Sequence, residues 1–258
     1  MVGIVKSSPF KLLYEIFCSN PQKIYRFVKG LKIFTLDDAT VYELIKSEYS
    51  FIRWGDGETA IARGKFAWYQ KFDKSLQDYL INLVSNPPKN TILGLPWAVS
   101  ASPFDKRWNL RIFKIIFSTR VFIIKNTHAE IMKNLHFSTQ DFWWRNSRDL
   151  LSILNNLLKD RECILITSDP NYLKLCPKGT AVITVPAINA FNQYEQIKNE
   201  IKSQISLFRT KPALLCAVGP TTKAIFLDFY TECQVLDIGH GFSFALNGIN
   251  SWAWTKKG

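Results

Sequence analysis

Short apolar runs alternate with amphipathic segments along most of the chain, and this alternation constrains the fold more than any other feature. The runs at residues 49–54, 91–95, 121–125, 163–167, 181–185, 213–218 and 234–238 are typical of buried strands. Helical spacing of apolar residues occupies 35–46, 75–84, 108–117, 150–158, 194–208 and 222–230. Short buried strands alternating with helices indicate an α/β fold with a mostly parallel sheet and helices on both faces.

The chain contains no repeat and no Gly/Ser-rich linker. Its composition changes only near residue 34, where a basic amphipathic segment ends. We therefore predict a basic amphipathic leader over residues 1–33 and a single domain over 34–258. A chain of 258 residues that is 47% hydrophobic can bury one sizeable core, which excludes a disordered protein. No apolar run approaches the roughly 20 residues that cross a bilayer, and the first residues lack a secretory cleavage pattern. We expect a cytoplasmic protein.

The formal charge is +12, from 33 Lys and Arg against 21 Asp and Glu. Such an excess points to an anionic partner: nucleic acid, an anionic membrane or a phosphorylated small molecule. The positive charge gathers in residues 1–33 and 104–125. The leader mixes lysines with apolar clusters, so it either makes a peripheral contact with the inner face of the membrane or packs on its own domain.

Ligands of parallel sheets bind at the carboxyl ends of the strands, and the first loop of interest there is RWGDGE, residues 53–58. Gly55 and Gly57 permit close backbone approach, while Asp56 and Glu58 place two carboxylates within one turn beside Arg53. A hard cation such as Mg²⁺ or Mn²⁺ is typically held by one or two carboxylates plus substrate phosphates. The loop is therefore suited to metal-assisted diphosphate binding. The alternative is an ordinary turn in which Asp56 caps a helix.

Two later loops also follow predicted strands. Gly219 gives a tight turn before a helix, where Thr221 would face a phosphate at the positive helix end; a simple Gly-Pro turn is the alternative. Asn189, in the PAINAF segment, is placed to bind a ligand or to cap the next helix.

The last strand leads into DIGH, residues 237–240. Asp237 and His240 are candidates for a general base, a metal ligand or a hydrogen-bonding group toward substrate. A structural histidine is the competing interpretation. The other two histidines have no comparable context.

Together RWGDGE, PAINAF, GPTT and DIGH, in this order, resemble the GT-D type glycosyltransferases, a bacterial group of capsule and glycoprotein glycan clusters. The resemblance implies a Rossmann-like domain that uses a nucleotide-diphosphate sugar, typically a UDP-sugar, and a divalent metal, Mn²⁺ or Mg²⁺, bound through the Asp-x-Glu motif. It implies a glycan or lipid-linked saccharide as acceptor, in surface polysaccharide or glycoprotein synthesis. Residues 168–172 and 241–244 depart from the family pattern.

Carried onto this chain, the resemblance gives Asp56 and Glu58 the metal and diphosphate role. His240 or Asp237 is the candidate base for the acceptor hydroxyl. The remaining donor-site residues implied are Arg53, Gly55 and Gly57, which shape the first loop, and Asn189, Gly219, Thr221 and His240, which line the pocket.

Two other functions compete with this interpretation. The positive charge and the cluster of Trp143, Trp144 and Arg145 fit a nucleic-acid-binding protein. The acidic Asp-x-Glu loop and the lack of a nucleic-acid motif argue against it, so no nucleic acid is expected. A metal-dependent phosphohydrolase on the same kind of sheet stays open, because a diphosphate site serves either reaction.

Overall fold

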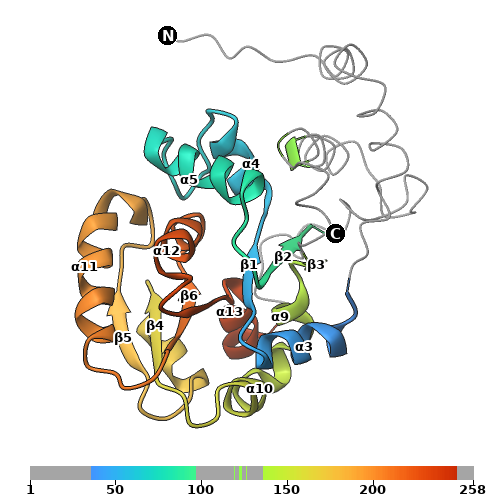
Figure 1. Ribbon diagram of the computed structural model, residues 1–258. Helices are drawn as coiled ribbons and strands as arrows, with labels where there is room; N and C mark the ends of the chain where they lie inside the picture. The colour runs from blue at the N-terminus through green and yellow to red at the C-terminus, as the bar shows by residue number, and fades with distance from the viewer. Residues whose placement is uncertain (1–35, 97–118, 120–121, 124–125, 127–135, 249–258) are drawn as a thin grey trace.

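The computed structural model describes residues 36–96, 119, 122–123, 126 and 136–248 (Figure 1). The predicted leader and nearly all of the basic segment 104–125 lie outside the described residues. At the centre is a seven-stranded sheet of order β3-β2-β1-β7-β6-β4-β5 in which every strand pairing is parallel. The strands are β1 (Ser50–Arg53), β2 (Thr91–Leu95), β3 (His136–Thr139), β4 (Cys163–Thr167), β5 (Ala181–Thr184), β6 (Ala213–Ala217) and β7 (Gln234–Asp237).

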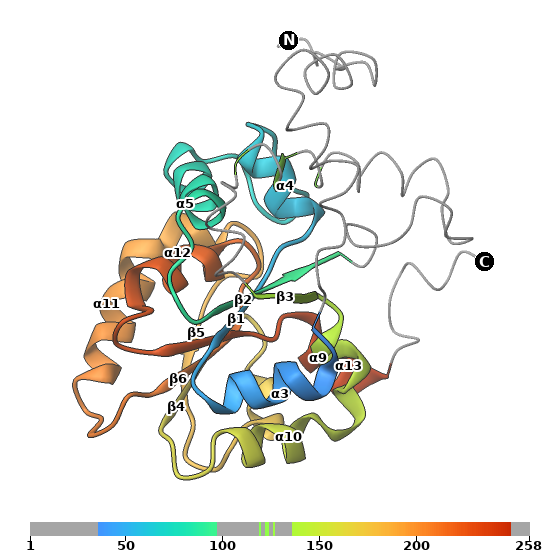
Figure 2. The same ribbon diagram turned by 45° about the vertical axis from the view of Figure 1, so that its right-hand side comes forward.

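Helices cover both faces of this sheet, as Figure 2 shows. One apolar core lies between the sheet and α4 (Asp56–Ala62), α5 (Lys74–Ser85), α11 (Tyr194–Ile205) and α12 (Thr221–Phe229). A second apolar core lies between the opposite face of the sheet and α3 (Asp38–Lys46), α9 (Phe142–Arg145), α10 (Leu150–Leu157) and α13 (His240–Asn247). Three short 3-10 helices complete the described chain: η1 (Ser147–Asp149), η2 (Pro170–Leu175) and η3 (Ala190–Gln193). The predicted α/β class is confirmed.

Local chemistry accounts for the element boundaries that sequence predicted well. Asp37 accepts a hydrogen bond from the Thr40 N–H at 2.7 Å and starts α3. Asp73 accepts from the Leu76 N–H at 3.1 Å and starts α5. Every residue of β2 and of β4 is buried, and apart from Thr91 and Thr167 neither strand carries a polar side chain.

One strand prediction needs correction, and one strand was not predicted. The segment 121–125 was expected to be extended, yet Phe122 and Ile123 are helical and buried. A short apolar run fits a helix as well as a strand, and here the Phe122 ring stacks on Trp54 with centroids 5.8 Å apart. Strand β3 was not predicted, because His136–Thr139 is a short edge strand with a polar sequence. The helix expected at 108–117 lies outside the described residues.

The chain order reverses beside β1. Strands β2 and β3 extend the sheet on one side of it, and β7, β6, β4 and β5 extend it on the other. This is a topological switch point, where open α/β sheets bind ligands outside the carboxyl ends of their strands. It places the RWGDGE loop after β1 next to the DIGH loop after β7, with the GPTT loop after β6 adjoining. No helix of the described chain is long and apolar enough to cross a membrane.

Candidate functional site

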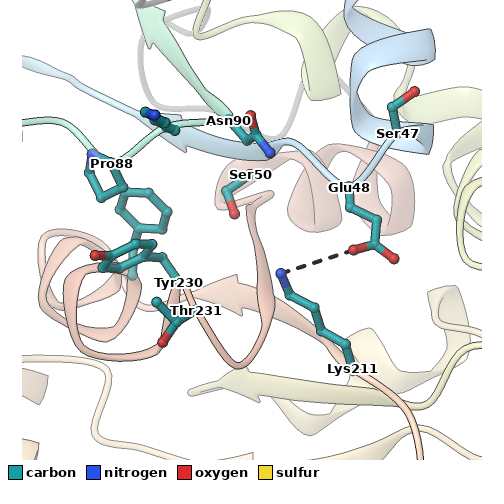
Figure 3. Close-up of a pocket in the computed structure, with 10 residues that line it drawn as sticks. Ser47, Glu48, Ser50, Pro88, Asn90, Lys211, Tyr230 and Thr231 are labelled. Atoms are coloured by element: carbon teal, nitrogen blue, oxygen red, sulfur yellow. Dashed lines mark ion pairs between the residues drawn. The ribbon is translucent and has the colours of Figure 1, made fainter.

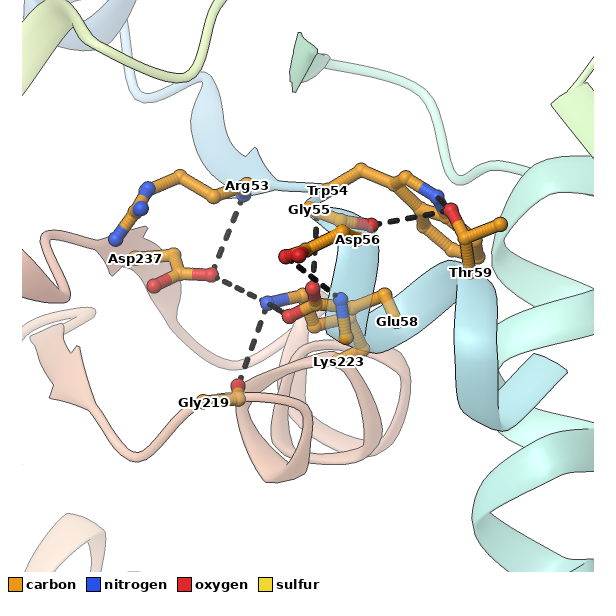
Figure 4. A network of polar contacts seen from close by, with 10 residues as sticks. Arg53, Trp54, Gly55, Asp56, Glu58, Thr59, Gly219, Lys223 and Asp237 are labelled. Atoms are coloured by element: carbon orange, nitrogen blue, oxygen red, sulfur yellow. Dashed lines mark hydrogen bonds and ion pairs between the residues drawn. The ribbon is translucent and has the colours of Figure 1, made fainter. Parts of the chain in front are cut away.

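A buried ion cluster joins the three loops at this edge (Figure 4). The Lys223 ammonium lies 2.6 Å from Glu58 Oε1 and 2.8 Å from Asp237 Oδ2. It also donates to the Gly219 carbonyl at 3.3 Å. The side chains of Lys223, Glu58 and Asp237 are 1%, 7% and 2% exposed, so water screens these charges little. One cation between two carboxylates thus ties α12 to α4 and β7.

Both ends of the Glu58–Lys223 pair are held in their charged forms. Burial raises the pKa of Glu58, but the Lys223 charge and the hydrogen bonds from Lys223 and the Gly55 N–H outweigh it, so the pKa lies below its usual value. Burial lowers the pKa of Lys223, but Asp237 and Glu58 outweigh it, so that pKa is raised. The pair is therefore ionised at neutral pH.

The two carboxylates of the Asp-x-Glu motif occupy different environments. Glu58 points inward, and its Oε2 accepts from the Gly55 N–H at 2.9 Å in a capping interaction that starts α4. Asp56 is exposed at the first residue of α4, where its Oδ1 accepts from the Gly57 N–H at 3.0 Å. The helix cap is Gly55, so the alternative in which Asp56 is the cap does not describe this turn.

This difference bears on the expected metal. No group of three or more His, Cys, Asp and Glu side chains within the described residues is arranged to hold a metal ion. The exposed Asp56 fits a cation that takes one carboxylate and completes its shell with substrate oxygens. Both oxygens of Glu58 are engaged, so direct ligation by Glu58 would require its carboxylate to leave Lys223. The metal roles of both residues stay predictions.

Arg53 occupies the space that Gly239 leaves. A Cβ on Gly239 would lie 1.9 Å from Arg53 Nη1, and Gly239 has a φ of +50°. The Arg53 backbone N–H donates to Asp237 Oδ2 at 3.3 Å. The Arg53 Nε is buried and has no hydrogen-bond partner in the part of the chain that the structure describes. A buried guanidinium N–H without an acceptor is a candidate donor to an anionic ligand.

His240 begins α13 beside this guanidinium. Its side chain has an exposed portion, yet its pKa is lowered to about 4, by burial first and then by the positive charge of Arg53. The imidazole is therefore neutral above about pH 5 and able to accept a proton. Asp237, the other base candidate, has its carboxylate occupied by Lys223 and by the Arg53 N–H.

Tyr69 closes the site from the connection between α4 and α5. A Cβ on Gly57 would lie 2.0 Å from the Tyr69 hydroxyl, and a Cβ on Gly219 would lie 3.3 Å from its ring. Gly57 is therefore needed to admit this side chain, whereas a Cβ at Gly219 would only crowd its ring. Burial, and then the carboxylates of Glu58 and Asp56, raise the pKa of Tyr69, so its phenol remains protonated.

Asn189 supports Tyr69 from behind. Its N–H donates to the Tyr69 carbonyl at 2.9 Å, and its Oδ1 accepts from the Lys71 N–H at 2.7 Å. It stands at the N-cap position of η3 with a φ of +57°, but its side chain makes no capping hydrogen bond to that helix. Ligand binding by Asn189 stays a prediction.

Thr221, predicted to meet a phosphate, is buried at the start of α12. Its hydroxyl and that of Thr222 have no hydrogen-bond partner among the described residues. The sequence did not single out Lys223 or Tyr69. The available signal for Lys223 was a charged residue within the otherwise apolar start of a predicted helix; Tyr69 had no motif around it.

A separate pocket of about 580 Å³ lies at the other edge of the sheet (Figure 3). It is lined by residues at the amino ends of β1, β2 and β6, including Ser50, Asn90 and Lys211, the last 4.0 Å from Glu48. None of the four motif loops reaches it. The chemistry therefore concentrates at the carboxyl edge, away from this pocket.

A profile of the glycosyltransferase GT-D fold matches residues 51–243. The chain belongs to this family of glycosyltransferases. The matched segment contains all four motif loops, from β1 to the start of α13.

Individual relatives agree with this GT-D assignment. The chain is 23% identical to glycosyltransferase GlyD of Streptococcus pneumoniae over 96% of its own length, but it spans only about 30% of that relative. A solved structure of a new glycosyltransferase (DUF1792) from Streptococcus sanguinis superposes with a TM-score of 0.63 at 22% identity, covering 83% of this chain and 85% of the other. A second solved structure of domain of unknown function 1792 gives 0.67 at 20% identity, covering 88% and 86%. At these identities the likeness shows the fold.

Proposed function

We propose that this GT-D chain transfers a sugar from a nucleotide-diphosphate sugar, in particular a UDP-sugar, to a glycan or lipid-linked saccharide in surface polysaccharide or glycoprotein synthesis. The observation that carries the proposal is the convergence of the first turns of α4 and α12 with Arg53 at the switch point of the sheet. Helix N-termini and an arginine together favour a bound anion. A diphosphate at this place would leave the sugar near His240.

The donor diphosphate would be recognised by groups of complementary charge and hydrogen-bonding capacity. The Arg53 Nε and the hydroxyl of Thr221 are buried donors without partners in the described chain. The Tyr69 hydroxyl, protonated and set over Gly57, is a third donor. Because leaving-group charge grows as the glycosidic bond breaks, donors fixed before the reaction lower its barrier.

Asp56 is the exposed carboxylate among the described side chains of this site, where the charges of Arg53 and Lys223 balance those of Glu58 and Asp237. We propose that it holds Mn²⁺ or Mg²⁺ together with diphosphate oxygens, and that Glu58 shares this role only where its carboxylate leaves Lys223. A bound cation supplies charge stabilisation to the departing diphosphate. In the described geometry Glu58, Lys223 and Asp237 position the three loops.

The acceptor hydroxyl loses a proton during transfer. Of the two candidate bases, the geometry favours His240, which is neutral and partly exposed, over the ion-paired Asp237. Cytoplasmic placement with peripheral contact through residues 1–33 completes the proposal, supported by the composition of that leader.

Transfer is tested by screening nucleotide sugars with Mn²⁺ and saccharide acceptors and measuring nucleoside diphosphate release. We expect release that depends on the acceptor, and its loss in Asp56→Asn. The matched control is Asp78→Asn, an exposed surface aspartate paired with Lys74 on α5. Nucleoside monophosphate and sugar phosphate released without any acceptor would indicate the phosphohydrolase instead. Equal activity of Asp56→Asn would remove Asp56 from the site.

A further inference from the structure

The connection between α4 and α5 turns large apolar side chains outward. Phe66 is 74% exposed, Trp68 is 83% exposed and Phe72 is 43% exposed. Ala67 and Gln70 form an antiparallel bridge that closes a tight turn, with Trp68 and Tyr69 between them. Single exposed apolar residues are ordinary, but three aromatic rings within seven residues form a patch of the kind that binds a partner.

Positive charge is interleaved with these rings. Lys65 and Lys71 are both exposed, and Arg63 precedes them. The acid of this segment, Asp73, is used to cap α5. The patch therefore presents apolar rings and cations together.

The patch borders the donor site. Tyr69, from the same turn, packs against Gly57 and Gly219, and its carbonyl accepts from the Asn189 N–H. Ile188, the residue before Asn189, is 57% exposed. In Figures 1 and 2 this connection lies at the upper end of the described chain, beyond the sheet edge that carries the site. We call Lys65, Phe66, Trp68, Lys71, Phe72 and Ile188 the aromatic-basic rim.

We propose that the aromatic-basic rim docks on an anionic lipid bilayer. Aromatic side chains settle at the boundary between headgroups and acyl chains, and lysines are drawn to anionic headgroups. A saccharide subsite would be concave and would offer carboxylates or amides to sugar hydroxyls, whereas this turn offers projecting rings and cations. The inference deepens and rests on the proposed function, because a bilayer here would present a lipid-linked saccharide to the site.

Co-sedimentation of the full chain with vesicles tests the rim. Vesicles of phosphatidylcholine with phosphatidylglycerol are compared with vesicles of phosphatidylcholine alone. We expect Phe66→Ser with Trp68→Ser to weaken partitioning at least about tenfold, and Lys65→Glu with Lys71→Glu to remove the preference for phosphatidylglycerol, since each lysine near the surface strengthens binding about fivefold. Unchanged partitioning of either double variant overturns the proposal.

Matched controls lie at the opposite edge of the sheet. Leu207→Ser replaces an apolar side chain that is 70% exposed, in the connection before β6. Lys159→Glu with Lys178→Glu reverses two exposed lysines that precede β4 and β5. We expect both controls to partition like the wild type; losses equal to those of the rim variants would show a general effect of charge or solubility and would refute a specific rim.

A second measurement locates the contact. Vesicles with brominated acyl chains quench tryptophan fluorescence at short range. We expect Trp68→Phe to keep binding while losing part of the quenching, and equal quenching in this variant contradicts the proposal. Rim variants that lose single-stranded oligonucleotide binding instead of vesicle binding would assign the rim to a nucleic acid.

Donor binding separates this inference from the proposed function. Calorimetric titration of Phe66→Ser and of Lys65→Glu with Lys71→Glu should give the nucleotide-sugar affinity of the wild type, because these side chains are exposed. Trp68 is kept in this measurement because its ring lies 5.0 Å from that of Tyr69. Vesicle binding without any nucleotide-sugar binding in the wild type would overturn the proposed function and leave the rim intact. Nucleotide-sugar binding without any vesicle binding in the wild type would overturn only the proposal that the rim docks on a bilayer.

Discussion

Replacing Lys223 by methionine removes the only cation from the buried Glu58–Lys223–Asp237 cluster as the structure describes it, while keeping most of the side-chain volume. Lys223 is 1% exposed and contacts the two carboxylates at 2.6 and 2.8 Å, so both would be left buried and facing each other. Removing one partner of a buried ion pair costs about 3–5 kcal/mol. For a chain of this size each kcal/mol lowers Tm by about 2–4 °C, which gives a fall of about 6–20 °C.

The loss should depend on pH in a definite direction. In the wild type the pKa of Glu58 is lower in the folded protein than its unfolded value of 4.5. The resulting stabilisation is fully present above pH 4.5 and is lost as the pH falls through the folded pKa. The raised pKa of Lys223 contributes below 10.5 and is lost above it. In Lys223→Met the charge and hydrogen bond of Lys223 are lost, so burial, the largest cause, is opposed only by backbone hydrogen bonds. We expect the pKa of Glu58 to rise, so that protonation relieves the repulsion. The difference in the free energy of unfolding between the wild type and Lys223→Met should therefore be smaller at pH 5 than at pH 7.5.

Urea unfolding followed by circular dichroism measures these free energies. The matched control is Lys198→Met, which removes an ion pair of 2.5 Å to Asp228 whose side chains are 25% and 18% exposed. Because Tyr79 and Tyr194 also donate to Asp228, we expect this control to cost about 1 kcal/mol or less. If Lys223→Met costs no more than Lys198→Met at pH 7.5, or if the gap widens on acidification, the electrostatic account of the cluster is wrong.

Three further predictions concern the walls of the site. Tyr69→Phe should weaken nucleotide-sugar binding about 2–13-fold in calorimetry with Tm unchanged, because it removes one hydroxyl donor of about 0.5–1.5 kcal/mol; unchanged affinity would place the hydroxyl away from the donor. The His240 imidazole should titrate near pH 4 by NMR, assigned with His240→Gln, and a midpoint near 6.5 would show that neither desolvation nor the Arg53 charge lowers its pKa. Gly239→Ala should lower both Tm and donor affinity, since its Cβ would lie 1.9 Å from Arg53 Nη1 at a φ of +50°; an unaffected variant would show that the guanidinium moves freely.

Most of the sheet was predictable because its strands are buried on both faces. The runs at 163–167 and 213–217 are apolar apart from Thr167 and pair with each other in register along β4 and β6. The position of the site followed from the same logic, since loops after parallel strands share one edge. Strand β3 could not be predicted in this way, because an edge strand of four residues, two of them half-buried, has little apolar pattern.

The internal chemistry of the site was less predictable. The sequence places Asp56 and Glu58 two residues apart but does not show that one faces solvent while the other turns inward to Lys223. That division depends on a contact between residues 165 positions apart. Tyr69 likewise acquires its place only through packing against Gly57 and Gly219, and no local pattern encodes such a contact.

The central claim is that the carboxyl edge of the sheet binds the diphosphate of a sugar donor through Asp56 and the first turns of α4 and α12. Calorimetric titration of UDP and UDP-sugars into wild type, Asp56→Asn and Asp78→Asn, with and without Mn²⁺, tests it most directly. The account predicts binding that is strengthened by Mn²⁺ in the wild type and in Asp78→Asn, and loss of the Mn²⁺ effect in Asp56→Asn. Absence of binding in the wild type, or an equal Mn²⁺ effect in Asp56→Asn, would contradict it.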